Sequence, residues 1–95
     1  MPAPDARLTA AQAEVRDVRR AALAKALVEA RKSADMTQNQ LADRSGLSRS
    51  AIARLEAGET SVSSDRLFDL AKALGVRLSD LIAAVEADPA AKKTL

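Results

Sequence analysis

The sequence predicts an all-α fold of five helices, the first of them long. Hydrophobic residues make up 47% of the 95 residues, but Phe68 is the only aromatic one, so the core must be built from Leu, Val, Ile and Ala. Alanine is abundant and β-branched residues are few, which favours helix over strand. Gly46, Gly58 and Gly75 each follow a helical pattern, the position at which a left-handed residue closes a helix. A chain of this length predicts one main domain.

The first predicted helix covers residues 8–34 and carries two apolar stripes. Thr9 and Gln12 have the spacing of a capping box at its start. At helical spacing the first stripe contains Leu8, Ala11, Val15, Val18 and Ala22, and the second contains Leu23, Leu27, Ala30 and Ala34. The second stripe is expected to pack on the domain core. The first either packs on a second subunit or another protein, or the helix breaks near Arg19.

The four remaining helices are predicted at residues 37–45, 48–57, 63–74 and 78–86. Thr37 and Gln40 give a second capping box, and Ser48 is a good N-cap for the third helix. The chain is therefore divided into an N-terminal helical extension at 1–18, a main domain at 19–87 and a flexible C-terminal tail at 88–95.

Composition excludes several classes of function. The chain has no Cys and no His, so thiolate sites, disulfides and the commonest acid–base group are missing. It also lacks a phosphate-binding glycine loop and a cluster of metal ligands, so no enzyme activity, cofactor or metal is expected. The start "MPAPDARL" lacks the apolar run of a secretory signal. We expect a cytoplasmic protein.

One basic window stands out, although the net charge of the chain is only +2. Arg44, Arg49 and Arg54 lie in a stretch without any acidic residue between Asp43 and Glu56. On a helical wheel the third helix has an apolar side and an opposite side, which carries Arg49, Ser50, Ala53 and Arg54. The short turn through Gly46 requires the second and third helices to cross steeply, which is the helix-turn-helix arrangement that places the later helix in the DNA major groove.

Several segments together resemble a known family. They are "TQNQLA" at the second helix, Gly46 in the turn, Ile52 in the third helix, "LEAGE" after it, and "LFDLAKALGV" as the fourth helix with its stop. At this spacing residues 31–76, about half of the chain, resemble the phage-repressor/Cro type of helix-turn-helix, or XRE family. The resemblance implies a five-helix repressor-like domain that binds double-stranded DNA.

The resemblance also implies roles for single residues. Arg49, Ser50 and Arg54 occupy base-reading positions, with Arg49 as a bidentate partner of guanine; Arg54 either reads a base or contacts the backbone. Gln38, Ser48, Arg44 and Thr37 are then the expected phosphate contacts, and Arg31 with Glu56 forms a structural salt bridge between the first and third helices. In the loop after Gly58, the sequence "ETSVS" lacks the basic residues common in the family.

These features predict a small transcriptional regulator, repressor-like, acting as a homodimer on a palindromic operator. The candidate dimer or partner surface contains Val15, Val18, Leu81, Ile82 and Val85. The alternative for the last three is that they only cover the domain core. An alternative is the antitoxin of a toxin–antitoxin pair, in which the N-terminal helix binds a toxin and the helix-turn-helix autoregulates. A third possibility is a helical interaction module that has lost DNA binding, against which the acid-free window argues.

Overall fold

The computed structural model describes residues 8–95, and in this range the all-α prediction is confirmed. Its helices are α1 (Ala10–Ser33), α2 (Gln38–Ser45), α3 (Arg49–Glu56), α4 (Ser64–Leu74), α5 (Leu78–Ala87) and α6 (Pro89–Lys92). Between residues 8 and 95 there is no strand, and no helix is long and apolar enough to cross a membrane. The first seven residues of the predicted N-terminal extension lie outside the described range.

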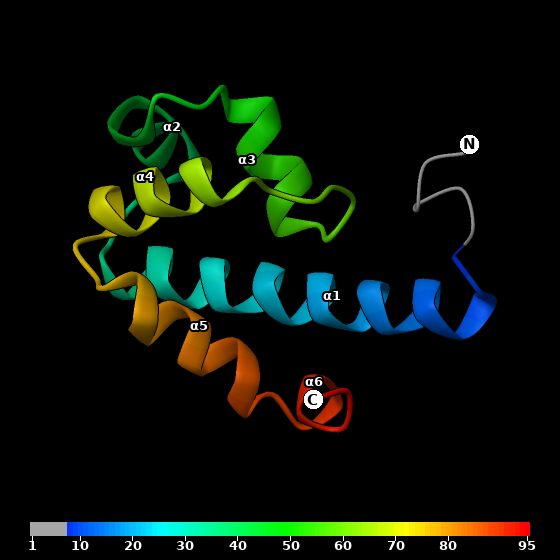
Figure 1. Cartoon of the computed structure of the whole chain (residues 1–95). Helices are drawn as coiled ribbons and strands as arrows, with labels where there is room; N and C mark the ends of the chain where they lie inside the picture. Colours follow the sequence, from blue (N-terminus) through cyan, green and yellow to red (C-terminus); the bar gives the residue numbers. More distant parts are fainter. Residues whose placement is uncertain (1–7) are drawn as a thin grey trace.

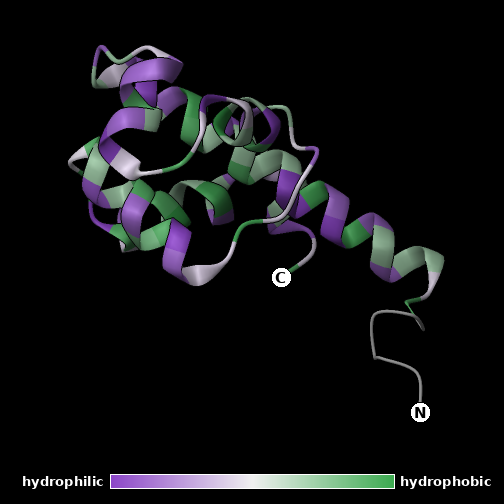
Figure 2. Cartoon of the chain, turned by 90° about the horizontal axis from the view of Figure 1, so that it is seen from above, coloured by the Kyte–Doolittle hydropathy of each residue, from purple (hydrophilic) through white to green (hydrophobic). Residues whose placement is uncertain are grey.

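Helix α1 is a continuous helix of 24 residues, so the predicted alternative of a break near Arg19 is wrong. Its start is the predicted capping box: the Thr9 hydroxyl accepts from the Gln12 N–H, and the Gln12 side chain accepts from the Thr9 N–H. The second apolar stripe packs on the core, where Leu27 is buried. Figure 1 and Figure 2 both show the N-terminal end of α1 projecting beyond the other helices.

The core takes one fully buried side chain from each of the first four helices: Leu27, Leu41, Ile52 and Leu70. They belong to one hydrophobic cluster, and Figure 1 shows α1 on one side of the molecule with α2, α3 and α4 facing it. Leu81 of α5 is only 3% exposed and belongs to the same cluster. Of the two alternatives for Leu81, the structure shows the core position and not a place on a dimer or partner surface, because its side chain is already covered within the chain.

Helices α2 and α3 have the caps that the sequence predicts. The Thr37 side chain and Gln40 form a reciprocal capping box at the start of α2, and the Ser48 hydroxyl accepts from the Ala51 N–H at the start of α3. Between them Gly46 has a φ of 78°, in the left-handed region. A residue with a Cβ is strained there, so glycine permits the tight turn that sets α3 across α2.

The C-terminal end differs from the predicted flexible tail, because residues 89–92 form α6. Pro89 occupies the first turn, and the Asp88 carboxylate accepts from the N–H groups of Ala90 and Ala91. Helix α6 packs on α1 with Ala91 only 1% exposed. Arg19 of α1 ties down the following residues, since its Nε donates to the Thr94 hydroxyl at 2.9 Å and its Nη2 to the Thr94 carbonyl at 2.6 Å.

We predict that Ala91→Asp lowers the free energy of unfolding by about 2 kcal/mol or more, because it buries a carboxylate without a partner. The control is Ala90→Asp, which adds the same charge at the exposed neighbouring position. Urea unfolding followed by circular dichroism measures both. Equal stability of the two variants would show that α6 does not cover α1 as described.

Candidate nucleic-acid interface

Helix α3 presents two different faces. Ile52 and Leu55 are buried at 0% and 6% exposure, which anchors the helix on the core. Arg49, Ser50 and Arg54 are exposed, and Ala53 between them is small. The resulting surface has guanidinium groups and a hydroxyl but no carboxylate, so a polyanion can approach it closely.

Hydroxyl groups lie at the beginning of α3 and of α2. The Ser48 hydroxyl accepts from the Ala51 N–H at 3.1 Å and lies 3.5 Å from the Ser50 hydroxyl. The Thr37 hydroxyl likewise accepts from the Gln40 N–H at 3.1 Å. A hydroxyl that accepts one bond still has its own hydrogen to donate. Capping and a phosphate contact are therefore compatible at Ser48 and Thr37.

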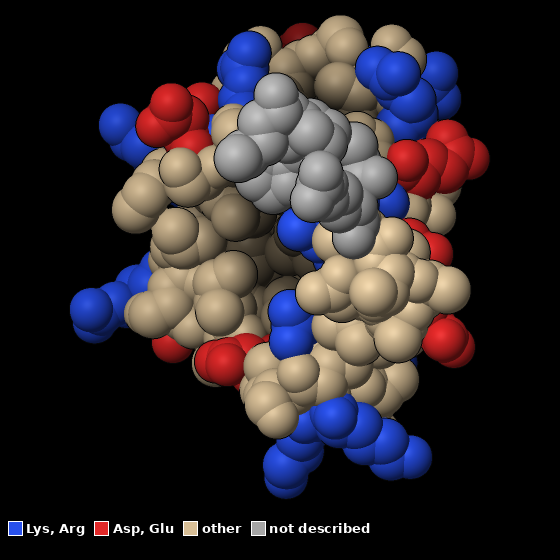
Figure 3. Space-filling model, turned by 45° about the vertical axis from the view of Figure 1, so that its right-hand side comes forward, with Lys and Arg blue, Asp and Glu red and all other residues tan. Residues whose placement is uncertain are grey.

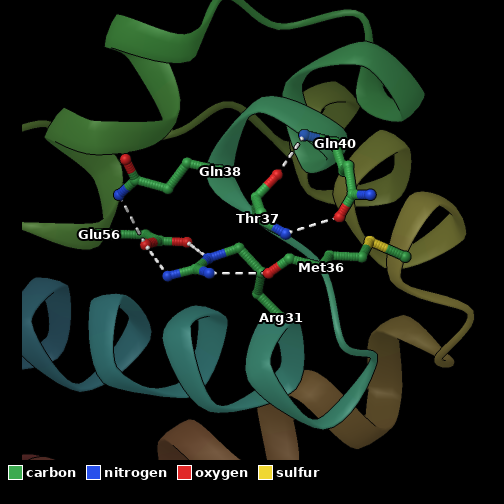
Figure 4. Close-up of polar contacts among 6 residues, drawn as sticks. All are labelled: Arg31, Met36, Thr37, Gln38, Gln40 and Glu56. Carbon is green, nitrogen blue, oxygen red and sulfur yellow. Dashed lines mark hydrogen bonds and ion pairs between the residues drawn. The ribbon is translucent and has the colours of Figure 1, made fainter.

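Behind this surface, the Glu56 carboxylate joins three helices (Figure 4). Arg31 of α1 donates to both of its oxygens, from Nε to Oε2 at 2.7 Å and from Nη2 to Oε1 at 3.0 Å. Gln38 of α2 donates from Nε2 to Oε1, also at 3.0 Å. The remaining Arg31 nitrogen, Nη1, donates to the Met36 carbonyl at 2.8 Å. The carboxylate at the end of α3 thus holds the start of α2 and the last turns of α1 in fixed positions.

The Arg31–Glu56 pair is largely removed from solvent, with 13% and 6% of the respective side-chain surfaces exposed. The hydrogen bond from Arg31 to Glu56 raises the pKa of Arg31, the negative charge of Glu56 adds to this effect, and burial partly opposes it. A group whose pKa is raised on folding loses its contribution to stability only as the pH rises through the folded value. Because that value lies above the already high ordinary one of arginine, Arg31 stays charged throughout the physiological range.

Gln38 lies at the start of α2, where the sequence places a phosphate contact, but its amide nitrogen is bound to Glu56. An amide nitrogen carries two hydrogens, so one remains for a second acceptor. The structure therefore gives Gln38 a structural role that the sequence analysis did not predict. A phosphate contact by the same side chain remains a proposal.

Arg44 lies apart from the other predicted residues. It is exposed in the last turn of α2 and lines a hollow with Ser45 of the same helix and with Asp69, Lys72 and Ala73 of α4. No residue of α3 lines this hollow. Among the predicted phosphate contacts, Arg44 therefore has the least support from the geometry.

Arg66, in the first turn of α4, was not among the site residues predicted from the sequence. Arg66 and Arg54 line one hollow of about 150 Å³, together with the hydroxyl-bearing residues Thr60, Ser61 and Ser63. The loop that lacked basic residues in the sequence is thus flanked by two arginines in the structure. In the sequence Arg66 is only a basic residue three positions after the N-cap Ser63. No local pattern indicates that it lies beside Arg54.

The other proposed surface residues remain accessible in part. Ile82 and Val85 of α5 are half-buried, as are Val15 and Val18 of α1. Ile82 and Val85 line a groove against α1, whereas Val15 lines a second hollow with Leu8 and Ala11. The structure therefore separates these surface residues into two places. Among residues 8–95, no cluster of acidic side chains could hold a metal ion.

Comparisons with known proteins agree with this geometry. A family model described as "Helix-turn-helix" matches residues 27–81. A crystal structure of the clp gene regulator ClgR from C. glutamicum has 31% sequence identity and a TM-score of 0.71, covering 75% of this chain and 92% of that chain. A second crystal structure of ClgR, from Corynebacterium glutamicum, has 32% identity and a TM-score of 0.72, covering 79% of each chain. No curated protein matches the chain.

We predict that Glu56→Ala lowers the free energy of unfolding by about 3 kcal/mol, because it leaves the buried Arg31 guanidinium without its carboxylate partner. The matched control is Glu59→Ala, which removes a carboxylate from the exposed side chain three residues later and should change stability by less than about 0.5 kcal/mol. Denaturant unfolding measures both. A loss at Glu56 no larger than that at Glu59 would contradict the role of the network.

Proposed function

Because this chain belongs to the XRE type of the helix-turn-helix family, we propose that it is a transcriptional regulator which binds double-stranded DNA sequence-specifically. The family identifies a DNA-binding regulator and not an enzyme. The observation that carries the proposal is the exposed face of α3, where Arg49, Ser50 and Arg54 surround the small Ala53. The nucleoid of the cytoplasm is the corresponding location.

In the proposed complex α3 lies in the major groove, and its exposed face meets the base edges. Arg49, in the first turn, donates two hydrogen bonds to O6 and N7 of a guanine. Ser50 contacts a neighbouring base, and Arg54 reads a base or the adjacent backbone. Alanine at position 53 allows the backbone of the helix to come close to the bases, since it adds only a methyl group.

Phosphate contacts on both sides of α3 fix its register. At the start of α2, the first N–H groups, the Thr37 hydroxyl and the second Gln38 amide hydrogen are available to one phosphate. Ser48 serves the start of α3 in the same way. Beyond the end of α3, Arg66 and the hydroxyls of the loop at 60–63 bind another phosphate beside Arg54. Arg44 is kept as a more distant phosphate contact.

A homodimer on a palindromic operator completes the proposal, with one α3 helix in each half-site. Two-fold symmetry would place the half-sites about 34–36 Å apart, one turn of DNA. The half-buried Ile82 and Val85 of α5 support self-association, because their apolar surface is only partly covered within the chain. Occupancy of an operator near a promoter is the simplest mode of repression.

The antitoxin function is the second candidate, and the projecting end of α1 favours it. Leu8, Ala11 and Val15 line a hollow of about 330 Å³ there together with Gln12, Arg16 and Arg19. An apolar stripe on a helix can bind a partner protein when the domain core does not cover it. In this case DNA binding by α3 would autoregulate the operon, and the partner would be a toxin encoded by a neighbouring gene.

The test of the proposed function is fluorescence anisotropy with labelled DNA from the gene's own upstream region and a scrambled duplex of the same composition. The label belongs on the DNA because the chain has no Trp or Tyr. Two salt concentrations are needed, since phosphate contacts make affinity salt-dependent. Tight binding to the upstream duplex alone supports the proposal. Equally weak binding to both duplexes opposes a self-regulating operator.

We predict that Arg49→Ala weakens binding to the specific duplex by about 1–3 kcal/mol and relaxes the preference at one base position. Arg66→Ala is the matched comparison, because it removes the same charge from the proposed phosphate contact. It should weaken binding to all sequences alike and reduce the slope of log K against log salt by about one. An Arg49→Ala loss that is equal on specific and scrambled DNA would refute base reading.

We further predict that Val15→Asp with Val18→Asp dissociates whatever assembly the α1 stripe makes, with a partner or with another copy. Light scattering with and without the product of the neighbouring gene measures the mass. Ala10→Asp with Ala13→Asp is the control, because it adds the same charge to the other side of α1. An unchanged mass in both mixtures would exclude this stripe as an interaction surface.

A further inference from the structure

A groove with apolar walls and basic residues lies across α1, α5 and the loop before α4. Its volume is about 350 Å³, and its apolar residues are Leu23, Val62, Leu67, Ile82 and Val85. Arg16, Arg19 and Arg20 of α1 also line it. Figure 3 shows a hollowed face of the molecule with Lys and Arg side chains beside the hollow. A cavity of about 150 Å³ is enough to admit a benzene ring, so this groove has room for an aromatic side chain.

The arginines at the groove are held in place by contacts within the chain. Arg19 donates to the hydroxyl and the carbonyl of Thr94. Arg20 has a nitrogen 3.6 Å from a carboxylate oxygen of Asp17, and 31% of its side-chain surface is exposed. Such positioned guanidinium groups can bind a carboxylate with a smaller loss of side-chain freedom than mobile ones.

The same chain exposes a side chain that fits this groove. Phe68 of α4, the only aromatic residue of the protein, is 63% exposed. Asp65 lies one helical turn before it and Lys72 about one turn after it, both exposed. Asp69, the next residue, is paired with Arg66, whose guanidinium nitrogen lies 4.0 Å from its carboxylate. Aromatic residues are typical anchors of protein interfaces.

We propose that the groove binds Phe68 of a second copy of this chain, with Asp65 of that copy beside the α1 arginines. The proposal deepens the homodimer of the proposed function and rests on it. Charge complementarity supports this occupant, because an apolar knob, Phe68 with the Asp65 carboxylate one turn before it, meets an apolar groove lined by arginines. Leu67 lines the groove and Phe68 is the next residue of the same helix, so knob and groove are neighbours on the surface.

Because Phe68 and the groove adjoin, two copies of the chain can form a closed dimer with two-fold symmetry. If a two-fold axis passes between knob and groove, each copy inserts its Phe68 into the groove of the other, and the same contact forms twice. Ile82 and Val85, which supported self-association, then become walls of the pocket around the partner's ring. In the single chain Ile82 and Val85 are half-buried and Phe68 is exposed. In the proposed dimer the second copy covers all three side chains.

Sedimentation equilibrium of the full chain without DNA tests this interface. Phe68→Ala is expected to raise the dissociation constant of the dimer by at least about thirtyfold, the effect typical of a lost aromatic anchor. Leu95→Ala is the matched control, since Leu95 is also exposed, at 69%, and should leave the constant unchanged. A wild-type chain that stays monomeric, or a Phe68→Ala variant that pairs like the wild type, would overturn the proposal.

A charge exchange tests the orientation of the pair. Asp65→Arg and Arg20→Asp should each produce monomers, because each places like charges together in both contacts. An equimolar mixture of the two variants should form dimers again. In such a mixed dimer one contact brings the two substituted positions together with their charges exchanged, and the other contact keeps the native pair of Asp65 and Arg20. A mixture that remains monomeric would contradict the proposed pairing.

Binding to a single half-site duplex separates this interface from the proposed DNA binding. Phe68→Ala should keep wild-type affinity for a half-site, which one α3 helix reads alone, and lose affinity only on the full palindrome. Loss of dimers with no DNA binding by any variant would leave the interface standing and reject the DNA function. If Phe68→Ala binds a half-site normally and still forms dimers like the wild type, the DNA function stands and the proposed interface is rejected.

Discussion

The arrangement of the DNA-facing helices depends on one carboxylate. Glu56 stands at the carboxyl end of α3, where a negative charge is unfavourable to the helix dipole, and it is stabilised there by Arg31 of α1 and Gln38 of α2. Because these two side chains come from different helices, the start of α2 and the whole of α3 are fixed relative to α1. The proposed recognition of DNA requires this fixed relation, since the proposed phosphate contacts at α2 must match the proposed base contacts at α3.

Local signals made much of the fold predictable. Capping residues such as Thr37 and Ser48 act on the next few residues of the chain, so their effect can be read without tertiary structure. Ile52 was placed correctly for a similar reason, because helical periodicity assigns it to the buried side of α3. The sixth helix had a local signal as well, since Asp88 and Pro89 form an N-cap followed by proline, but only packing on α1 shows that Ala91 is covered.

Features that join distant parts of the chain were harder to predict. Leu81 and Ile82 are adjacent and equally apolar, yet one is in the core and the other lines a groove. The resemblance implied a phosphate contact for Gln38, but its hydrogen bond to Glu56, 18 residues away, could not be predicted from the local sequence. The role of Arg66 could not be predicted from the local sequence either, because the loop at 60–63 brings it beside Arg54 only after folding.

In the proposed complex Arg49 on α3 reads a guanine in the major groove. Dimethyl sulfate probing of the upstream duplex tests it directly, because the reagent methylates guanine N7 in the major groove and adenine N3 in the minor groove. We expect the wild-type chain to protect one guanine N7 in each half-site and Arg49→Ala to lose that protection, while adenine N3 remains reactive. Protection of adenine N3 alone, or guanine protection that survives Arg49→Ala, would contradict it.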